Sequence, residues 1–324
     1  MKPAVSVVIP TFRRPDLLER CLIAVANQEF DQGSYEIIVV NDGPDAVTRH
    51  LVESRRRRVA VGPSIRYLAL PGRCGPAAAR NRGWRSAAGP LIAFTDDDTI
   101  PDRRWLKEGC AALGPDLVAV WGRVRVPVSR DATDYERDAG RLDNAEFVTA
   151  NCFVRHSALL AVGGFDERFR AAWREDSDLF FSLLERAGRV APAPHAVVVH
   201  PVRPAHWGVS LAQQRKVLFD ALLFKKHPRL YREKIRPAPP WAYYAIVSAL
   251  LAGLAAFLAG WPLLGLLALA VWLALTARFC WRRLANTSRA ARHVLEMIVT
   301  SVAIPPLAVF WRLAGALKFR VPFV

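Results

Sequence analysis

The sequence predicts an α/β domain with a largely parallel sheet, followed by a membrane-embedded helical hairpin. Over the first hundred residues, short apolar runs rich in β-branched residues alternate with helical patterns, as in βαβ units. From Trp241 to Phe279 the only charged residue is Arg278. One membrane span needs about 20 apolar residues, so this segment is long enough for two helices with a turn at 260–262.

The α/β half begins with an apolar run at 5–9, which we expect to be the first strand. Pro15 suits the first turn of a helix, which we expect to run to about Gln28. The same alternation predicts further strands at 35–40, 65–70 and 91–95, a helix ending near 57 and an Ala-rich helix at about 75–87. Such sheets bind ligands beyond the carboxyl ends of their strands.

The middle of the chain has a different pattern. Longer strands are expected at 117–126 and 146–154, separated by a polar stretch. A helix should start near Trp173, and a short last strand at 196–199 should end at His200. These elements would complete a domain over residues 1–202.

Three consecutive aspartates, Asp96 to Asp98, follow the expected strand at 91–95. Adjacent carboxylates repel each other, and a divalent cation such as Mg²⁺ or Mn²⁺ would offset that repulsion because hard cations prefer oxygen ligands. The alternative is a solvated acidic turn that caps the next helix. Polar residues also lie at the other strand ends of this half, namely Thr11, Arg13, Arg14, Asn41, Asp42 and Arg73.

A second acidic site lies in the first turn of the helix expected near Trp173. Glu175 and Asp176 there could simply complement the helix dipole. A carboxylate that faces the metal could instead serve as a general base. His200, at a strand end, could supply a nitrogen ligand to the metal, although a lone histidine is more often structural; His195 is the competing candidate.

The basic residues gather beside the apolar hairpin. The net charge is +16, with nine Lys or Arg residues at 203–236 and five arginines at 278–292. Because basic loops stay on the cytoplasmic side, both ends of the hairpin are expected in the cytoplasm, where these residues would attract anionic lipid heads. This distribution, without a nucleic-acid-binding motif, argues against nucleic acid as the partner.

The C-terminal third is expected in three parts: a basic interfacial segment at 203–238, two transmembrane helices at 239–281, and a basic loop with a last apolar segment at 282–324. That last segment is apolar for about fifteen residues and is interrupted by Pro305 and Pro306. It is short for a span. We therefore expect an interfacial or re-entrant segment, with a third membrane helix as the alternative.

Cysteine usage and the N-terminus bear on the compartment. The five cysteines are scattered and have no CxxC spacing, which indicates a reducing compartment and no zinc site. The apolar run at 5–9 is too short for a signal peptide. These features agree with a cytoplasmic catalytic domain on a multi-pass protein of the cell inner membrane.

Four segments in order carry a family resemblance: VSVVIPTFRRPDLLERCL, EIIVVNDGPDA, GPAAARNRGWRSAAGPLIAFTDDD and GGFDERFRAAWREDSDLFFSL. Together, over about residues 3–200, they resemble the family 2 glycosyltransferases with the GT-A fold. The resemblance implies a metal-dependent, inverting sugar transfer from a nucleotide-diphospho-sugar, with Mg²⁺ or Mn²⁺ as cofactor. One departure is Asn41 before Asp42, where the family often has two acids. A QxxRW motif is also absent, which argues against a processive polysaccharide synthase.

The resemblance assigns roles residue by residue. It maps Asp176 onto the catalytic base, and Asp96 and Asp98 onto the DxD motif, with Asp97 as a spacer. The expected substrate-binding residues are Pro10, Thr11, Arg13, Asp42, Arg73, Asp96 and Glu175. Of these, Asp42 would contact the nucleotide base of the donor. The expected metal ligands are Asp98, Asp96 and, by a looser match, His200.

The predicted function is transfer of a sugar to a hydroxyl acceptor at the cytoplasmic membrane face, on a lipid-linked or cell-envelope glycan. A nucleotidyltransferase of similar fold is a competing enzyme hypothesis, but Pro10 to Arg13 lacks a glycine-rich phosphate loop. A catalytically degenerate membrane scaffold is the non-enzymatic alternative. Retention of the acids at 42, 96, 98 and 176 argues against it.

Overall fold

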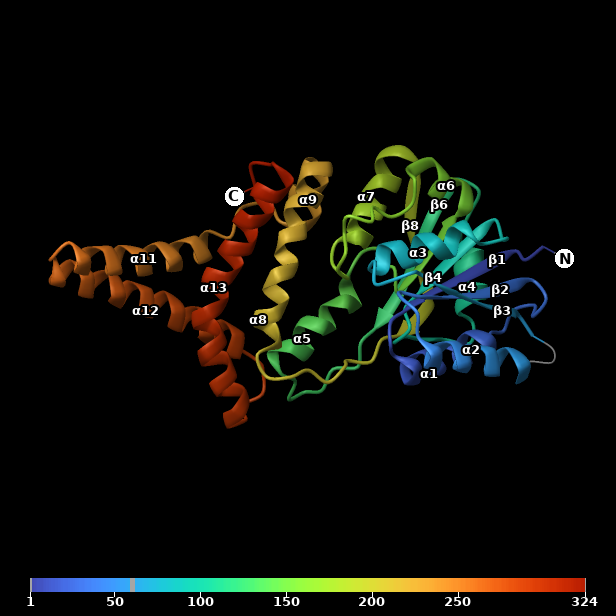
Figure 1. Ribbon diagram of the computed structural model, residues 1–324, viewed down its shortest axis with the longest axis horizontal. Helices are drawn as coiled ribbons and strands as arrows, with labels where there is room; N and C mark the ends of the chain where they lie inside the picture. The colour runs from blue at the N-terminus through green and yellow to red at the C-terminus, as the bar shows by residue number, and fades with distance from the viewer. Residues whose placement is uncertain (1, 59–61, 324) are drawn as a thin grey trace. The chain divides into compact units, whose positions relative to one another are not determined.

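The computed structural model describes residues 2–58 and 62–323 (Figure 1). The chain divides into two compact units. The sheet unit comprises Met1–Pro127 and Arg141–Val202, and the helical unit comprises Val128–Gly140 and Arg203–Val324. The chain thus leaves the sheet unit after Pro127, returns at Arg141, and leaves it again after Val202.

The sheet unit is built on one mixed sheet, whose strand order over the described residues is β3-β2-β1-β4-β7-β6-β8-β5. The first four strands in that order run parallel, β7 is antiparallel to both β4 and β6, β6 is parallel to β8, and β5 is antiparallel to β8. The strands are β1 (Val5–Thr11), β2 (Tyr35–Asn41), β3 (Ser64–Ala69), β4 (Leu91–Thr95), β5 (Ile100–Pro101), β6 (Leu117–Arg125), β7 (Asn151–Arg155) and β8 (Arg189–Val199).

Helices cover both faces of this sheet. In Figure 1, α1 and α2 lie on one side of β1–β3, and α3 lies on the other. The helices of the sheet unit are α1 (Pro15–Ala26), α2 (Ala46–Arg58), α3 (Pro76–Arg85), α4 (Trp105–Ala112), α6 (His156–Val162) and α7 (Glu175–Arg186), with a 3-10 turn at Arg141–Asn144.

The alternation of side chains along the strands explains these two layers. Val39 of β2 packs in the same buried cluster as Leu18 of α1, whereas its neighbour Val40 packs with Ala79 of α3. Successive residues of a strand point to opposite faces, so an apolar run without polar gaps is buried on both. At Gly83 of α3, an added Cβ would lie 2.3 Å from Val8, so glycine permits this close helix-to-strand contact.

The second half of the sheet unit differs from the prediction. The strand expected at 146–154 begins only at Asn151, because Phe147 has φ +43° and cannot continue an extended chain. The last strand is longer than expected, since β8 begins at Arg189. Helices α4 and α6 were not predicted; both are short, at 8 and 7 residues.

The helical unit contains helices and no strand among its described residues. Residues 128–140 join it through α5, where Arg283 lies 2.7 Å from Asp134 and the Ser288 amide donates to the Ala132 carbonyl. Its elements are α5 (Asp134–Gly140), α8 (Val209–Gln213), η2 (Gln214–Val217), α9 (Leu218–Lys226), α10 (Pro228–Leu230), η3 (Tyr231–Ile235), α11 (Trp241–Leu258), α12 (Pro262–Leu284) and α13 (Ala291–Phe319). Of these, η2 is a 3-10 helix and η3 is a π-helix.

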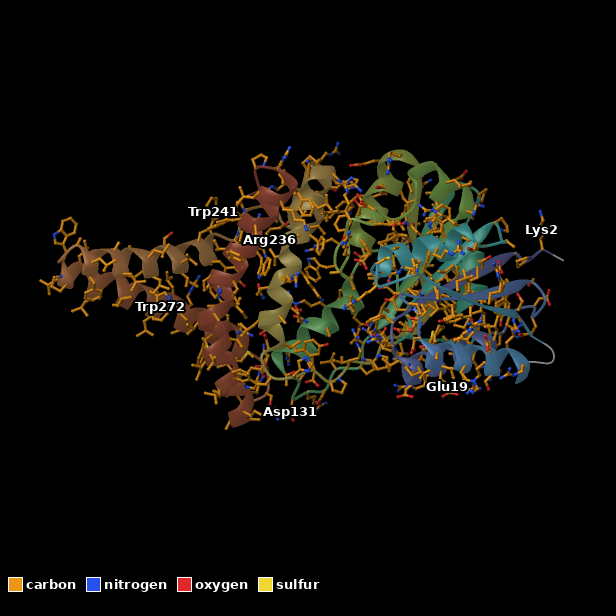
Figure 2. All side chains as sticks on the ribbon, in the orientation of Figure 1. Lys2, Glu19, Asp131, Arg236, Trp241 and Trp272 are labelled. Atoms are coloured by element: carbon orange, nitrogen blue, oxygen red, sulfur yellow. The ribbon has the colours of Figure 1, made fainter. Side chains whose placement is uncertain are left out.

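Helices α11 and α12 form the predicted hairpin and lie side by side (Figure 1). They approach closely at two glycines: an added Cβ would lie 3.0 Å from Leu269 at Gly253 and 2.9 Å from Phe257 at Gly265. Figure 2 shows mostly carbon atoms along the hairpin, with Trp272 on α12. Helices α11, α12 and α13 are each long and apolar enough to cross a membrane.

Helix α13 is continuous over 29 residues. The interruption predicted at Pro305 and Pro306 is therefore wrong, although a proline inside a helix removes one backbone hydrogen bond. The helix runs beside α9, and an added Cβ at Gly315 would lie 2.7 Å from the Leu218 carbonyl oxygen. In Figure 1, α13 extends crosswise to the hairpin and alongside α8 and α9.

Candidate active site

The candidate site lies where β1, β2 and β4 end. These three strands are parallel neighbours, so their carboxyl ends meet at one edge of the sheet. Thr11 is the last residue of β1 and is in register with Asn41 of β2, while Thr95 ends β4 immediately before the aspartate triplet. The predicted convergence of polar residues at this edge follows from the observed topology.

Asp97, the middle aspartate, is buried and directly bonded to the end of β1. Its carboxylate accepts a 2.7 Å hydrogen bond from the Thr11 hydroxyl and one of 3.3 Å from Arg14. Burial raises the pKa of Asp97 to about 6 and the charge of Asp98 acts in the same direction, while Arg14 and Thr11 oppose them. Asp97 therefore has its own structural partners and does more than separate its neighbours.

Asp98 faces His200 at the end of β8. Their nearest oxygen and nitrogen atoms are 3.5 Å apart, and Arg14 lies 3.7 Å from the other Asp98 oxygen. His195, the competing histidine, is an exposed residue within β8. Of the two histidines, His200 is the one paired with the triplet.

The metal-ligand set supplied by the protein is small. Within residues 2–58 and 62–323, no three His, Cys, Asp or Glu side chains cluster as a metal site. Asp98 and His200 offer one oxygen and one nitrogen, and the Asp96 carboxylate is engaged by Arg80. This partial set fits a divalent ion of the kind that is bound by one or two protein groups together with substrate phosphates and water.

Asp42, at the end of β2, holds the loop that precedes α3. Its carboxylate accepts hydrogen bonds from the amides of Cys74 (2.6 Å) and Gly75 (2.9 and 3.0 Å), and its side chain is buried. Gly75 has φ +100°, and an added Cβ would lie 2.7 Å from the Arg170 carbonyl oxygen. This glycine is therefore required by both backbone conformation and space.

Two arginines lie over the ring of Phe12 beside that loop. The guanidinium carbons of Arg73 and Arg13 lie 4.8 Å and 5.4 Å from the centre of its ring, within cation–π range. Arg13 has φ +52°, an unusual conformation for a residue with a side chain. Pro10 is buried within β1, in register with Val40.

Arg80 of α3 connects the triplet to the second acidic site. Its two terminal nitrogens lie 2.7 Å from an Asp96 oxygen and 3.1 Å from a Glu175 oxygen. Burial would lower the pKa of Arg80, but the two carboxylates raise it above its ordinary value. Burial raises the pKa of Glu175 to about 7, and the charge of Asp176 acts in the same direction.

Asp176 is in the first turn of α7 and remains partly exposed. One oxygen accepts hydrogen bonds from the amide (2.6 Å) and hydroxyl (3.3 Å) of Ser177. Arg174, immediately before the helix, has φ +73° and stacks on Trp173 at 4.6 Å. A partly exposed carboxylate next to the Arg80–Glu175 pair is available to a ligand.

The structure joins four of the predicted residues into two pairs. Asp96 and Glu175 meet through Arg80, and Asp98 meets His200, while Asp42 organises the adjacent loop. Arg80 and the stacking of Phe12 were not predicted. An arginine inside an Ala-rich helix was the available signal for Arg80, but its carboxylate partners are distant in sequence.

Two family models match the chain. The Glycosyl transferase family 2 model matches residues 6–166, and the Glycosyl transferase family group 2 model matches residues 91–313, more than half of the chain. The chain belongs to the family 2 glycosyltransferases.

Individual relatives agree with this family. The glycosyltransferase AglE of Haloferax volcanii is 28% identical over 66% of this chain and 72% of its own length. The validoxylamine A glucosyltransferase of Streptomyces hygroscopicus subsp. limoneus is 36% identical over 71% of this chain, which spans 58% of that relative. The fold resembles a mannosyltransferase from Pyrobaculum calidifontis, solved with GDP-Man and Mn²⁺, with a TM-score of 0.58, 19% identity, and coverage of 99% of this chain and 88% of that one.

Proposed function

We propose that this protein is a metal-dependent, inverting glycosyltransferase that moves a sugar from a nucleotide-diphospho-sugar to a hydroxyl acceptor at the cytoplasmic membrane face. The acceptor class we propose is a lipid-linked or cell-envelope glycan. The observation that supports this best is the Arg80 contact, which brings the triplet and the first turn of α7 within the reach of one side chain. A donor-binding group and a candidate base are then neighbours.

In the proposed reaction, Asp176 accepts the proton of the acceptor hydroxyl. The acceptor oxygen attacks C1 of the sugar from the face opposite the diphosphate, and the bond between C1 and the diphosphate oxygen breaks. The electron pair leaves with the nucleoside diphosphate, and the anomeric centre is inverted. A partly exposed carboxylate suits this role because a general base must reach its substrate.

Donor binding is proposed to involve both groups of residues at the sheet edge. Asp98 and His200 would hold Mg²⁺ or Mn²⁺, which neutralises charge on the leaving diphosphate when bound. Asp42, Arg73 and the Phe12 ring would form the nucleotide end of the site. Mn²⁺ is the ion in the complex of the mannosyltransferase with a similar fold.

A direct test combines binding with transfer. The full chain in detergent would be screened with nucleotide-diphospho-sugars and Mn²⁺ by thermal shift, because a ligand that binds the folded state raises the unfolding midpoint. We expect one class of donor to raise the midpoint and to be consumed when a lipid-linked acceptor is added. A chain that binds no nucleotide-diphospho-sugar under any of these conditions would contradict the proposal.

For the membrane topology, we propose that only the hairpin α11–α12 crosses the inner membrane. Basic residues flank it: Arg236 precedes α11, and Arg282 and Arg283 lie in the last turn of α12. This agrees with both ends of the hairpin on the cytoplasmic side. Figure 2 shows Arg236 and Trp241 together at the beginning of the hairpin, as in a membrane–water boundary.

Helix α13 is proposed to lie in the membrane surface, with the basic segment formed by α8, η2 and α9. Two observations support this over a third span: α13 extends crosswise to the hairpin (Figure 1), and it packs along η2 and α9. Its exposed residues form an apolar face, and its opposite face is buried in the unit. The exposed apolar residues are Leu295, Ile298, Val299, Val302, Phe310, Leu313 and Leu317.

Reporter fusions distinguish the two topologies. A fluorescent protein that folds only in the cytoplasm and a phosphatase active only outside it would each be fused behind α13. The in-plane arrangement predicts fluorescence and no phosphatase activity. Phosphatase activity would favour a third span.

A further inference from the structure

The Arg80 side chain lies between the donor side and the base side of the proposed site. It is almost fully buried, with 4% of its side chain exposed, and so is that of Glu175, at 5%. Asp96 lies directly after β4, and Glu175 begins α7, so the three residues come from three separate elements. The end of β4 and the start of α7 are far apart in the sequence, and several helices and strands lie between them along the chain.

We propose that Arg80 is a positioning residue that fixes Asp96 and the first turn of α7 relative to each other, so that the donor and Asp176 are aligned for transfer. This deepens the proposed function and rests on it. Arg80 does not take a proton or contact the reacting atoms in this proposal. It acts through Asp96 on one side and through Glu175, the residue before Asp176, on the other.

The chemistry of the side chain suits this role. The guanidinium group is planar, and its terminal nitrogens point in fixed directions, so one side chain can bond two carboxylates with a set spacing. Here one terminal nitrogen contacts Asp96 and the other contacts Glu175. The ammonium of a lysine has no such fork, and a Lys at this position would have to favour one acid.

A second consequence concerns Asp96 itself. When both are charged, the carboxylates of Asp96 and Glu175 would repel each other without the cation between them. With Arg80 in place, the Asp96 carboxylate is directed toward α3, whereas Asp98 is paired with His200. Arg80 thereby separates the roles of the first and third aspartates of the triplet.

The test compares Arg80→Lys and Arg80→Met with a matched control on the same helix. Arg85 is also paired with a glutamate, Glu167 at 3.5 Å, but its side chain is 53% exposed. We expect kcat to fall at least 100-fold in Arg80→Met and about 10-fold in Arg80→Lys, with the KM for the donor changed less than threefold. Arg85→Met should retain kcat within twofold.

A double-mutant cycle then tests the connection to α7. Arg80→Met should reduce kcat by a smaller factor in a Glu175→Gln background than in the wild-type background, and the two factors should differ at least fivefold. The reason is that Glu175→Gln has already weakened the contact between residues 80 and 175. Hydrogen exchange on the intact chain gives a readout independent of activity. Arg80→Met should speed amide exchange at 174–178 and at 96–98, whereas Arg85→Met should not.

The outcomes separate this inference from the proposed function. Suppose that the wild-type chain catalyses transfer. An unchanged kcat in Arg80→Met, or additive effects in the double-mutant cycle, would then overturn the positioning role and leave the proposed function standing. Absence of transfer by the wild type with any nucleotide-diphospho-sugar would count against the proposed function, and the exchange measurement would still decide whether Arg80 orders the two segments. If Arg80→Met does not fold, Arg80→Lys takes its place because it retains the charge. The positioning role is then tested by the kcat and the amide exchange of Arg80→Lys.

Discussion

The hydroxyl of Thr11 donates a 2.7 Å hydrogen bond to the carboxylate of Asp97, which fixes the end of β1 to the middle of the aspartate triplet. Both side chains are buried. The bond explains how three adjacent carboxylates are held in a defined arrangement: Asp97 is turned toward β1, while Asp96 and Asp98 take other partners. The triplet is thus three differently held carboxylates at one strand end.

Replacing Thr11 tests the importance of this bond. Thr11→Val leaves a buried carboxylate without one partner, which costs about 1–3 kcal/mol in the free energy of unfolding. We expect a lower thermal unfolding midpoint for the full chain in detergent. Thr11→Ser keeps the hydroxyl and is the control. Equal midpoints for Thr11→Val and the wild type would show that the bond contributes little.

The loop before α3 offers a pair of glycines for a second prediction. Gly75→Ala would place a Cβ 2.7 Å from the Arg170 carbonyl oxygen at φ +100°, whereas at Gly72 an added Cβ meets nothing within 4 Å. Strain of this kind costs of order 1–3 kcal/mol. We expect Gly75→Ala to lower both the unfolding midpoint and the affinity for the nucleotide. Gly72→Ala should do neither. If the two variants behave alike, the requirement for glycine at position 75 is refuted.

The raised pKa of Glu175 predicts how stability depends on pH. Its pKa is about 7 in the folded chain against an ordinary value of 4.5, so the folded state binds more protons between these values. Linkage then requires stability to fall as pH rises from about 4.5 to about 7. Asp97 contributes in the same direction up to about pH 6.

Glu175→Gln should remove its share of this slope. We expect the unfolding midpoint of the variant, relative to that of the wild type, to be higher at pH 7.5 than at pH 4.5. The exposed Glu167→Gln is the control and should parallel the wild type. If the unfolding midpoints of Glu175→Gln and the wild type change in parallel with pH, the raised pKa of Glu175 is not the cause of the slope.

Metal binding provides a fourth prediction, because His200 and His195 differ in position. Of the two, His200 is the histidine paired with Asp98, so His200→Ala should weaken Mn²⁺ binding about 10-fold or more, measured by calorimetry on the full chain in the presence of nucleoside diphosphate. His195→Ala should bind like the wild type. Excess EDTA should abolish transfer, and turnover that persists in EDTA would remove the metal from the proposal.

The sequence was sufficient for the first half of the sheet but not for the second. Runs such as Ile37 to Val40 are apolar on both faces of the sheet and belong to parallel strands, so pattern and topology agree. The start of β7 depends on the left-handed backbone of Phe147, which no residue pattern marks. Likewise, α13 continues through Pro305 and Pro306, because tertiary packing outweighs the local cost of the prolines.

In the site, too, some residues can be recognised from the sequence and others only from the fold. The acids at 96–98 and 175–176 are recognisable because chemistry and position agree along the chain. The role of Arg80 could not be predicted, since it depends on two carboxylates, one just after β4 and one at the start of α7, that only the fold brings together. Asp97 was interpreted as a spacer because its partner, Thr11, lies on another strand.

The Asp176→Asn variant shows whether Asp176 is the base of an inverting transfer. The measurement is the rate of transfer and the anomeric configuration of the product by NMR, with donor binding followed in parallel by thermal shift. The proposal predicts an inverted product from the wild type, and for Asp176→Asn intact donor binding with transfer reduced at least 1,000-fold. Wild-type rates in Asp176→Asn, or a product that retains the donor's configuration, would contradict it.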